Sequence, residues 1–174
     1  MRREITIKEV IFRLQTYEQF SAEETVKYQE LKEKWEKVNA EYHTNLYARA
    51  NLQDTNKGTP ERRDLFHTLE LHEELFAEIL RDINYELQRL YNERQIYKRI
   101  RCCYSSLVGK EREIILNRYI KSKPYKEVLS DFKGSQRTFE RVRNSALEKI
   151  RDRFNSFASD AEIVKNSEKG DVDL

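Results

Sequence analysis

Residues 60–109, "PERRDLFHTLELHEELFAEILRDINYELQRLYNERQIYKRIRCCYSSLVG", decide the expected fold, because neither proline nor glycine interrupts them between their ends. Thr59 and Pro60 form a helix start, since a capping hydroxyl precedes proline at the first helical position. The stretch therefore predicts one helix of about 45 residues and about 65 Å. Apolar side chains recur along it at helical spacing: Leu69, Phe76, Leu80, Ile83, Leu87, Leu90, Tyr97 and Tyr104.

Two capping boxes precede this stretch and predict two further helices. Thr6 and Glu9 are spaced so that each side chain can bond the backbone amide of the other, which predicts a short helix at about residues 7–20. The same spacing recurs at residues 21–24 and predicts a second helix at about residues 22–50.

The second of these helices has its own apolar stripe, with alternating spacings of three and four as in a coiled coil: Tyr28, Leu31, Trp35, Val38 and Tyr42. Asp, Asn, Gly and Pro then gather and predict a loop at about residues 51–59. Neither long helix can bury its apolar side alone, so the stripes close within one chain, between copies, or both. We expect a coiled-coil oligomerisation part over residues 1–108, a dimer being favoured, with a seam of Trp35, Leu69, Phe76, Leu80, Ile83, Leu87, Leu90 and Tyr97.

The composition agrees with an all-α protein of long amphipathic helices. Hydrophobic residues make up 38% and charged residues 37% of the 174 residues, with only 4 Gly and 2 Pro to break helices. No apolar run approaches the roughly 20 residues that cross a bilayer, and the amino terminus has no signal-peptide pattern. We expect a cytoplasmic protein in which Cys102 and Cys103 are reduced thiols, a vicinal disulfide being the alternative.

Positive charge is concentrated in one segment of the chain. Residues 109–157 hold 13 Lys and Arg against 7 Asp and Glu, whereas residues 1–108 are nearly balanced. Residues 158–174 hold 2 against 5 and show no apolar pattern, so we expect a flexible acidic tail there. The basic segment is where a polyanion would bind.

The basic segment predicts three helices that end in a helix-turn-helix. A first helix follows Gly109, which is expected to end the long helix, and a short helix follows Pro124. Lys133 and Gly134 form the turn, and Ser135 is a good N-cap for a last helix at residues 136–153. The side chains expected to face inward are Ile114, Ile115, Tyr119, Val128, Leu129, Phe132, Phe139, Val142, Ala146 and Ile150.

The outward side of the last helix has the residue types that read base edges in the major groove. Arg suits guanine, Gln and Asn suit adenine, and Glu can accept a hydrogen bond from cytosine. The candidate base-reading residues are Gln136, Arg137, Glu140, Arg141 and Asn144. The candidate phosphate contacts, which give affinity without sequence choice, are Lys121, Lys123, Lys126, Lys133, Ser135 and Arg143.

Residues Glu111 to Phe154, "EREIILNRYIKSKPYKEVLSDFKGSQRTFERVRNSALEKIRDRF", resemble sigma factor region 4, the helix-turn-helix that reads the promoter −35 element. A helical front half with this module at its end is similar to phage late-gene transcription regulators of the ArpU/RinA type. The resemblance implies a phage or prophage activator in a bacterial cell that binds double-stranded DNA and contacts RNA polymerase. No promoter-melting region of a complete sigma factor is evident.

Two positions depart from the family pattern. Leu129 stands where a small residue is usual, which predicts a wider crossing of the two motif helices. Lys133 then Gly134 stand where Gly then an apolar residue is usual, so either Lys133 takes a positive φ or the turn is shifted by one residue.

Other functions have weaker support in the sequence. The same surface could bind a polymerase subunit or another regulator without DNA. A terminase small subunit, which packages DNA, also joins such a module to an oligomerising part, but there the module normally comes first. His67 and His72 are five apart, which does not fit two metal ligands on one helix turn, and no Gly-rich phosphate loop occurs. We expect no enzyme activity, metal or cofactor.

Overall fold

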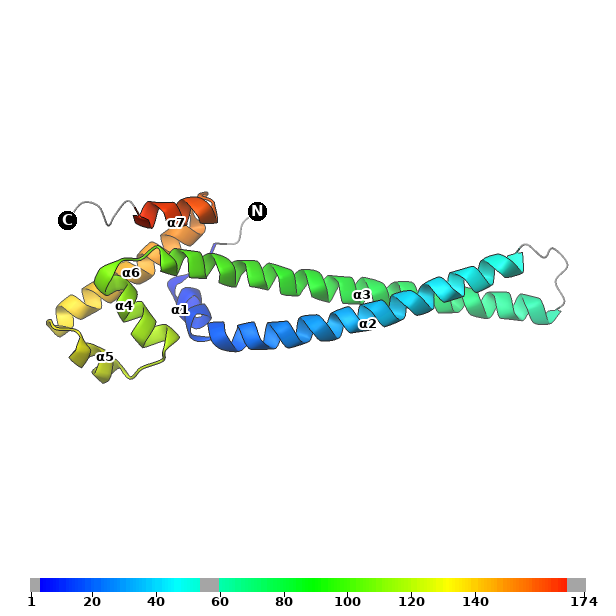
Figure 1. Cartoon of the computed structure of the whole chain (residues 1–174), viewed down its shortest axis with the longest axis horizontal. Coiled ribbons are helices and arrows are strands. Elements are labelled where there is room, and N and C mark those ends of the chain that lie inside the picture. Colours follow the sequence, from blue (N-terminus) through cyan, green and yellow to red (C-terminus); the bar gives the residue numbers. More distant parts are fainter. Residues whose placement is uncertain (1–3, 54–59, 169–174) are drawn as a thin grey trace. The chain divides into compact units, whose positions relative to one another are not determined.

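The computed structural model describes residues 4–53 and 60–168, and every regular element in these ranges is a helix (Figure 1). The elements are α1 (Ile7–Gln15), α2 (Tyr17–Gln53), α3 (Pro60–Ser105), α4 (Gly109–Ile115), the π-helix η1 (Leu116–Ile120), α5 (Tyr125–Asp131), α6 (Gln136–Asn155) and α7 (Asp160–Glu168). The all-α prediction is confirmed. Within the described ranges no helix has the length and apolarity needed to span a membrane.

Contacts divide the chain into two compact units, Met1–Ala22 with Glu93–Leu174, and Glu23–Asn92. The second unit is a helical hairpin made by parts of α2 and α3 that run antiparallel (Figure 1). The expected loop begins later than predicted, because residues 51–53 still belong to α2, and its residues 54–59, including Thr59, lie outside the described ranges. The single long helix of the opening stretch is confirmed as α3, which has 46 residues.

The hairpin unit is held by a seam that mixes apolar and polar contacts. The Asn45 amide donates to the carbonyl of Leu69 at 3.0 Å, and Nη1 of Arg49 lies 2.8 Å from Oε2 of Glu73. Ile83 is buried. The other predicted seam residues of this unit are half-buried: Trp35, Leu69, Phe76, Leu80, Leu87 and Leu90. These contacts join α2 and α3 of the same chain, so this part of the seam is formed within one chain.

Tyr97, a predicted residue of the oligomer seam, instead packs within its own chain and belongs to the other unit. Its ring stacks on Phe20 with centroids 4.0 Å apart, and its hydroxyl lies 2.9 Å from Oγ1 of Thr16. Thr16 separates α1 from α2, and its backbone N–H bonds the carbonyl of Phe12. Because α2 already begins at Tyr17, the capping box expected at residues 21–24 lies inside that helix and does not start one.

The first unit has one main core that joins its amino-terminal and carboxy-terminal segments. Val10 of α1, Ile100 of α3 and Ile150 of α6 are among its fully buried side chains. The predicted cap of α1 is confirmed, since Oγ1 of Thr6 accepts from the Glu9 amide at 3.3 Å. The expected domain boundary at residue 108 therefore cuts through a unit that also includes α1 and the end of α3.

Gly109 opens α4 instead of ending the long helix, which stops at Ser105. Its φ of +52° is a conformation that glycine adopts without a side-chain penalty. The chain therefore changes direction at this residue, between the end of α3 and the start of α4.

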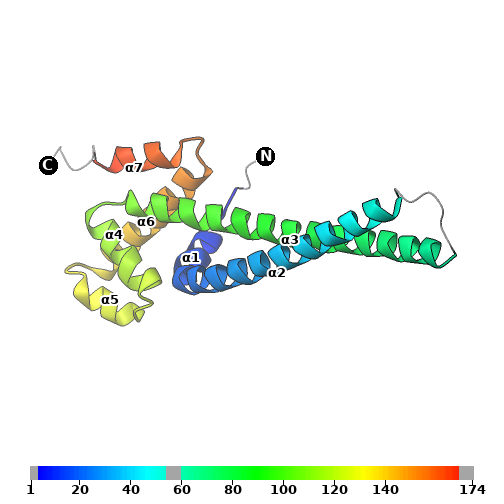
Figure 2. The same ribbon diagram turned by 45° about the vertical axis from the view of Figure 1, so that its right-hand side comes forward.

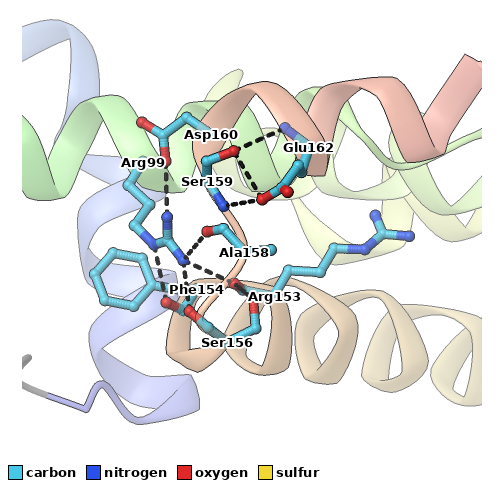
Figure 3. A network of polar contacts seen from close by, with 8 residues as sticks. All are labelled: Arg99, Arg153, Phe154, Ser156, Ala158, Ser159, Asp160 and Glu162. Atoms are coloured by element: carbon cyan, nitrogen blue, oxygen red, sulfur yellow. Dashed lines mark hydrogen bonds and ion pairs between the residues drawn. The ribbon is translucent and has the colours of Figure 1, made fainter.

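The prediction of a flexible tail is wrong for residues 160–168, which form helix α7. Ser159 and Glu162 make a capping box, in which the Glu162 carboxylate accepts from the Ser159 amide at 2.7 Å and the Glu162 amide donates to the Ser159 hydroxyl at 3.3 Å. Ile163 is buried, and Asp160 bonds Arg99 of α3 (Figure 3). The Ser-x-x-Glu spacing was the sequence signal for this helix.

Candidate nucleic-acid interface

Helices α4, α5 and α6 form a small three-helix module around its own apolar cluster, and they lie together in both ribbon views (Figures 1 and 2). Ile114, Val128 and Phe139 are buried, one from each helix. The Phe139 ring meets Tyr125 and Phe132 edge-on, with centroids 5.5 Å apart in each pair. The short α5 is thereby packed against the start of α6, as the helix-turn-helix prediction requires.

Two carboxylate contacts tie α6 to α4 farther along. Oε1 of Glu111 accepts from Nζ of Lys149 at 2.7 Å and from the hydroxyl of Ser145 at 3.3 Å. The inward stripe of α6 is confirmed, because Phe139, Ala146 and Ile150 are fully buried and Val142 is half-buried. The face of α6 that points away from this packing is thus determined.

The turn between α5 and α6 is built differently from the sequence expectation. Among the described residues, Ser122 is the only non-glycine residue with positive φ, so Lys133 does not adopt that conformation. Gly134 also has an ordinary φ, but a Cβ on it would lie 2.8 Å from Cε1 of Phe132. The glycine is needed because the Phe132 ring, which packs on Phe139, occupies the space of a side chain.

Ser135 caps α6, as predicted, since its Oγ accepts from the Thr138 amide at 3.2 Å. The same hydroxyl lies 2.9 Å from Oγ1 of Thr138. The cap uses one acceptor lone pair of the hydroxyl, and the assignment of Ser135 as a phosphate contact stays a prediction.

The five candidate base-reading residues share one side of α6, because a helix turns about 100° per residue and their positions span about 140°. Gln136, Arg137, Arg141 and Asn144 are exposed, and Glu140 is half-buried. In the described part of the chain, the guanidinium groups of Arg137 and Arg141 form neither ion pairs nor hydrogen bonds. Two cations at the start of the helix therefore face solvent without a counter-charge.

Three members of this region form a hydrogen-bond network. Oε1 of Glu140 accepts from the Tyr125 hydroxyl at 3.1 Å and from Nε2 of Gln136 at 3.2 Å. The bonds from Gln136 and then Tyr125 lower the pKa of Glu140, so its carboxyl group is ionised at neutral pH. Desolvation, followed by the bond to Glu140, raises the pKa of Tyr125. Sequence reasoning missed Tyr125, because no local pattern connects it with a residue on the next helix.

Asn144 is engaged by its neighbour on the helix. Its Oδ1 accepts from Nε and Nη2 of Arg143 at 3.2 and 3.0 Å. The carbonyl side of this amide is therefore occupied, and its NH₂ group remains as a donor.

The candidate phosphate contacts differ in how free their charges are. Lys121, Lys126 and Lys133 are exposed and form no ion pair with any described residue. Lys123 instead lies 2.6 Å from Glu127 and 3.7 Å from Asp131, and the bond to Glu127 is the main cause of its raised pKa. Its charge is already compensated, so it is a weaker candidate for a phosphate contact than the other three lysines.

No group of three or more His, Cys, Asp or Glu in the described ranges is arranged to hold a metal ion. Comparisons with protein-family models, with curated proteins and with solved structures find no match to this chain.

Proposed function

We propose that this protein is a transcription regulator that binds double-stranded DNA and reads its sequence with the outward side of α6. The observation that carries the proposal is the pair Arg137 and Arg141, exposed and without counter-charges in the described chain. They lie on a helix whose opposite side is anchored by fully buried Phe139 and Ala146. Exposed guanidinium groups on a rigid helix are suited to guanine O6 and N7 in a major groove.

The charge around this face supports a nucleic-acid partner. Residues 109–157 have an excess of Lys and Arg, with Lys126 in the first turn of α5 and Lys133 in the link between α5 and α6. These lysines supply sequence-independent attraction to phosphates, whereas the α6 residues choose among sequences. The proposed biological role, following the sigma region 4 resemblance, is activation of phage or prophage late genes, with RNA polymerase as a further partner.

We also propose that the hairpin unit joins two copies of the chain. Most of its seam side chains are only half-buried, and Leu71, Leu75 and Tyr85 are more than half exposed. A second hairpin covering these side chains would bury apolar area that one chain leaves in water. Two modules carried by one dimer would meet two half-sites at a set spacing. Light scattering on the purified chain tests this part, and a monomer at micromolar concentration contradicts it.

The main test is selection of duplexes from a random pool by the purified full chain at a stated salt concentration. We expect a defined sequence to be enriched, and Arg137→Ala and Arg141→Ala each to cost about 1–3 kcal/mol on that sequence. Lys126→Ala should weaken specific and random duplexes equally, because phosphate contacts do not depend on sequence. Arg81→Ala, an exposed arginine of the hairpin unit, is the matched control. Equal losses on specific and random duplexes for both α6 arginines contradict base reading.

A further inference from the structure

Tyr125 connects the two motif helices through a polar contact that faces the proposed reading surface. Its hydroxyl bonds Oε1 of Glu140 at 3.1 Å, and its ring is held edge-on against Phe139 at 5.5 Å. The same carboxylate oxygen holds Nε2 of Gln136 at 3.2 Å. A half-buried tyrosine on α5 therefore restrains two candidate base-reading side chains on α6.

The chemistry of the three groups determines the direction of each bond. An ionised carboxylate only accepts hydrogen bonds, so the Tyr125 hydroxyl donates and the Gln136 side chain must turn its NH₂ group toward Glu140. This orientation leaves the Gln136 carbonyl oxygen pointing away as an acceptor. Oε2 of Glu140 forms no hydrogen bond with any described residue, so it is a second available acceptor.

The rest of the face presents donors instead. Arg137 and Arg141 have only N–H groups, and the Asn144 carbonyl already accepts two bonds from Arg143. Acceptors are thus confined to Gln136 and Glu140. In the major groove, the groups that donate to such acceptors are the exocyclic amines of the bases, N4 of cytosine and N6 of adenine.

On the basis of the DNA-reading function proposed above, we infer that Tyr125 is a positioning residue that sets base specificity. By holding Glu140, and through it Gln136, it directs two acceptor oxygens toward an exocyclic amine of cytosine or adenine. The lowered pKa of Glu140 agrees with this role, because it keeps the carboxylate ionised and unable to donate. Tyr125 itself does not contact the base in this arrangement.

The experiment compares the full-length wild type with Tyr125→Phe, which removes only the hydroxyl group. Binding is measured, at one salt concentration, to the selected duplex, to its single-base variants and to random duplex. We expect wild type to prefer one base pair about fivefold or more at one position of the selected duplex, and the variant to lose that preference to within about twofold. Affinity for random duplex should not change. Loss of a preference for a G·C pair assigns the amine to cytosine, and loss of a preference for an A·T pair assigns it to adenine.

Two controls separate positioning from a general loss of structure. Tyr91→Phe removes the hydroxyl of an exposed tyrosine in the hairpin unit and should change no preference. In a Glu140→Ala background, Tyr125→Phe should have no further effect on base preference, because the carboxylate through which it acts is absent. Thermal unfolding of each variant by circular dichroism reports any loss of the fold separately from specificity.

The outcomes are distinct. If wild type discriminates among duplexes but Tyr125→Phe has the same preferences at every position, Tyr125 does not position the reading residues, and the DNA-binding proposal still stands. If wild type shows no discrimination, the proposed function fails, and this inference fails with it.

Discussion

Arg99 is the residue whose removal should most disturb the carboxy-terminal part of the first unit (Figure 3). It is 8% exposed, and its Nε donates to the Phe154 carbonyl at 2.9 Å. Its Nη2 donates to the carbonyls of Ser156 at 2.8 Å and Ala158 at 3.0 Å. These acceptors lie at the end of α6 and in the link to α7, where a helix leaves its last carbonyls unpaired. Arg99 therefore caps α6 and holds α7 at the same time.

The magnitude expected for Arg99→Met follows from the burial of these bonds. Methionine retains the apolar stem but leaves the carbonyls of Phe154, Ser156 and Ala158 without their donor, and each buried acceptor left unpaired costs about 1–3 kcal/mol, so we expect a loss of about 3–5 kcal/mol in all. The ion pair with Asp160, at 2.8 Å, contributes little of this, because the Asp160 side chain is 36% exposed. Asp160→Asn, the matched control, should therefore cost at most about 1 kcal/mol.

Urea unfolding of each variant gives the free energy difference, and hydrogen exchange with mass spectrometry locates it. Amides of α6 and α7 should exchange faster in Arg99→Met, since 1.4 kcal/mol corresponds to about tenfold in an opening equilibrium. Amides of the hairpin unit should exchange as in wild type. A loss below about 1 kcal/mol, or faster exchange spread evenly over both units, would refute the reasoning.

Three further predictions concern stability and reactivity. Gly134→Ala should destabilise the chain by about 1–3 kcal/mol in urea unfolding, because the new Cβ meets the Phe132 ring at 2.8 Å, and an unchanged midpoint contradicts this. Burial raises the pKa of Cys103 to about 12, so iodoacetamide at pH 8 should modify it slowly in native protein and quickly in urea, and equal rates would show that the thiol is not protected. The lowered pKa of Glu140 means that its stabilising contribution is present above its unfolded pKa, near 4.5, and lost as pH falls through the folded value. The free energy of unfolding should therefore decrease less on acidification in Glu140→Gln than in wild type, and parallel pH profiles contradict the assignment.

Much of the helical architecture could be predicted from local patterns. The caps at Thr6 and Ser135 depend on side chains three residues apart, and the inward stripe of α6 depends on spacings of three and four. Such signals need no knowledge of distant parts of the chain, because a helix closes its hydrogen bonds within four residues. The exposed positions of Arg137 and Arg141 follow from the same stripe, as the side left over.

The remaining features depended on contacts between residues far apart in sequence. Tyr97 packs on Phe20 instead of joining an oligomer seam, and Tyr125 bonds Glu140 of the next helix. An apolar stripe shows that a side must be buried but not what covers it.

The sequence by itself determined an all-helical chain, its basic segment and the exposed side of α6. Periodicity, capping and charge depend on residues that are close together in the sequence. Only the tertiary structure decided that α7 is anchored by Arg99 and that Gly134 makes room for an aromatic ring. It also decided which side-chain oxygens of Gln136 and Glu140 remain free to accept a hydrogen bond. The physical reason is that hydrogen-bond partners and packing volumes depend on how separate helices meet in space.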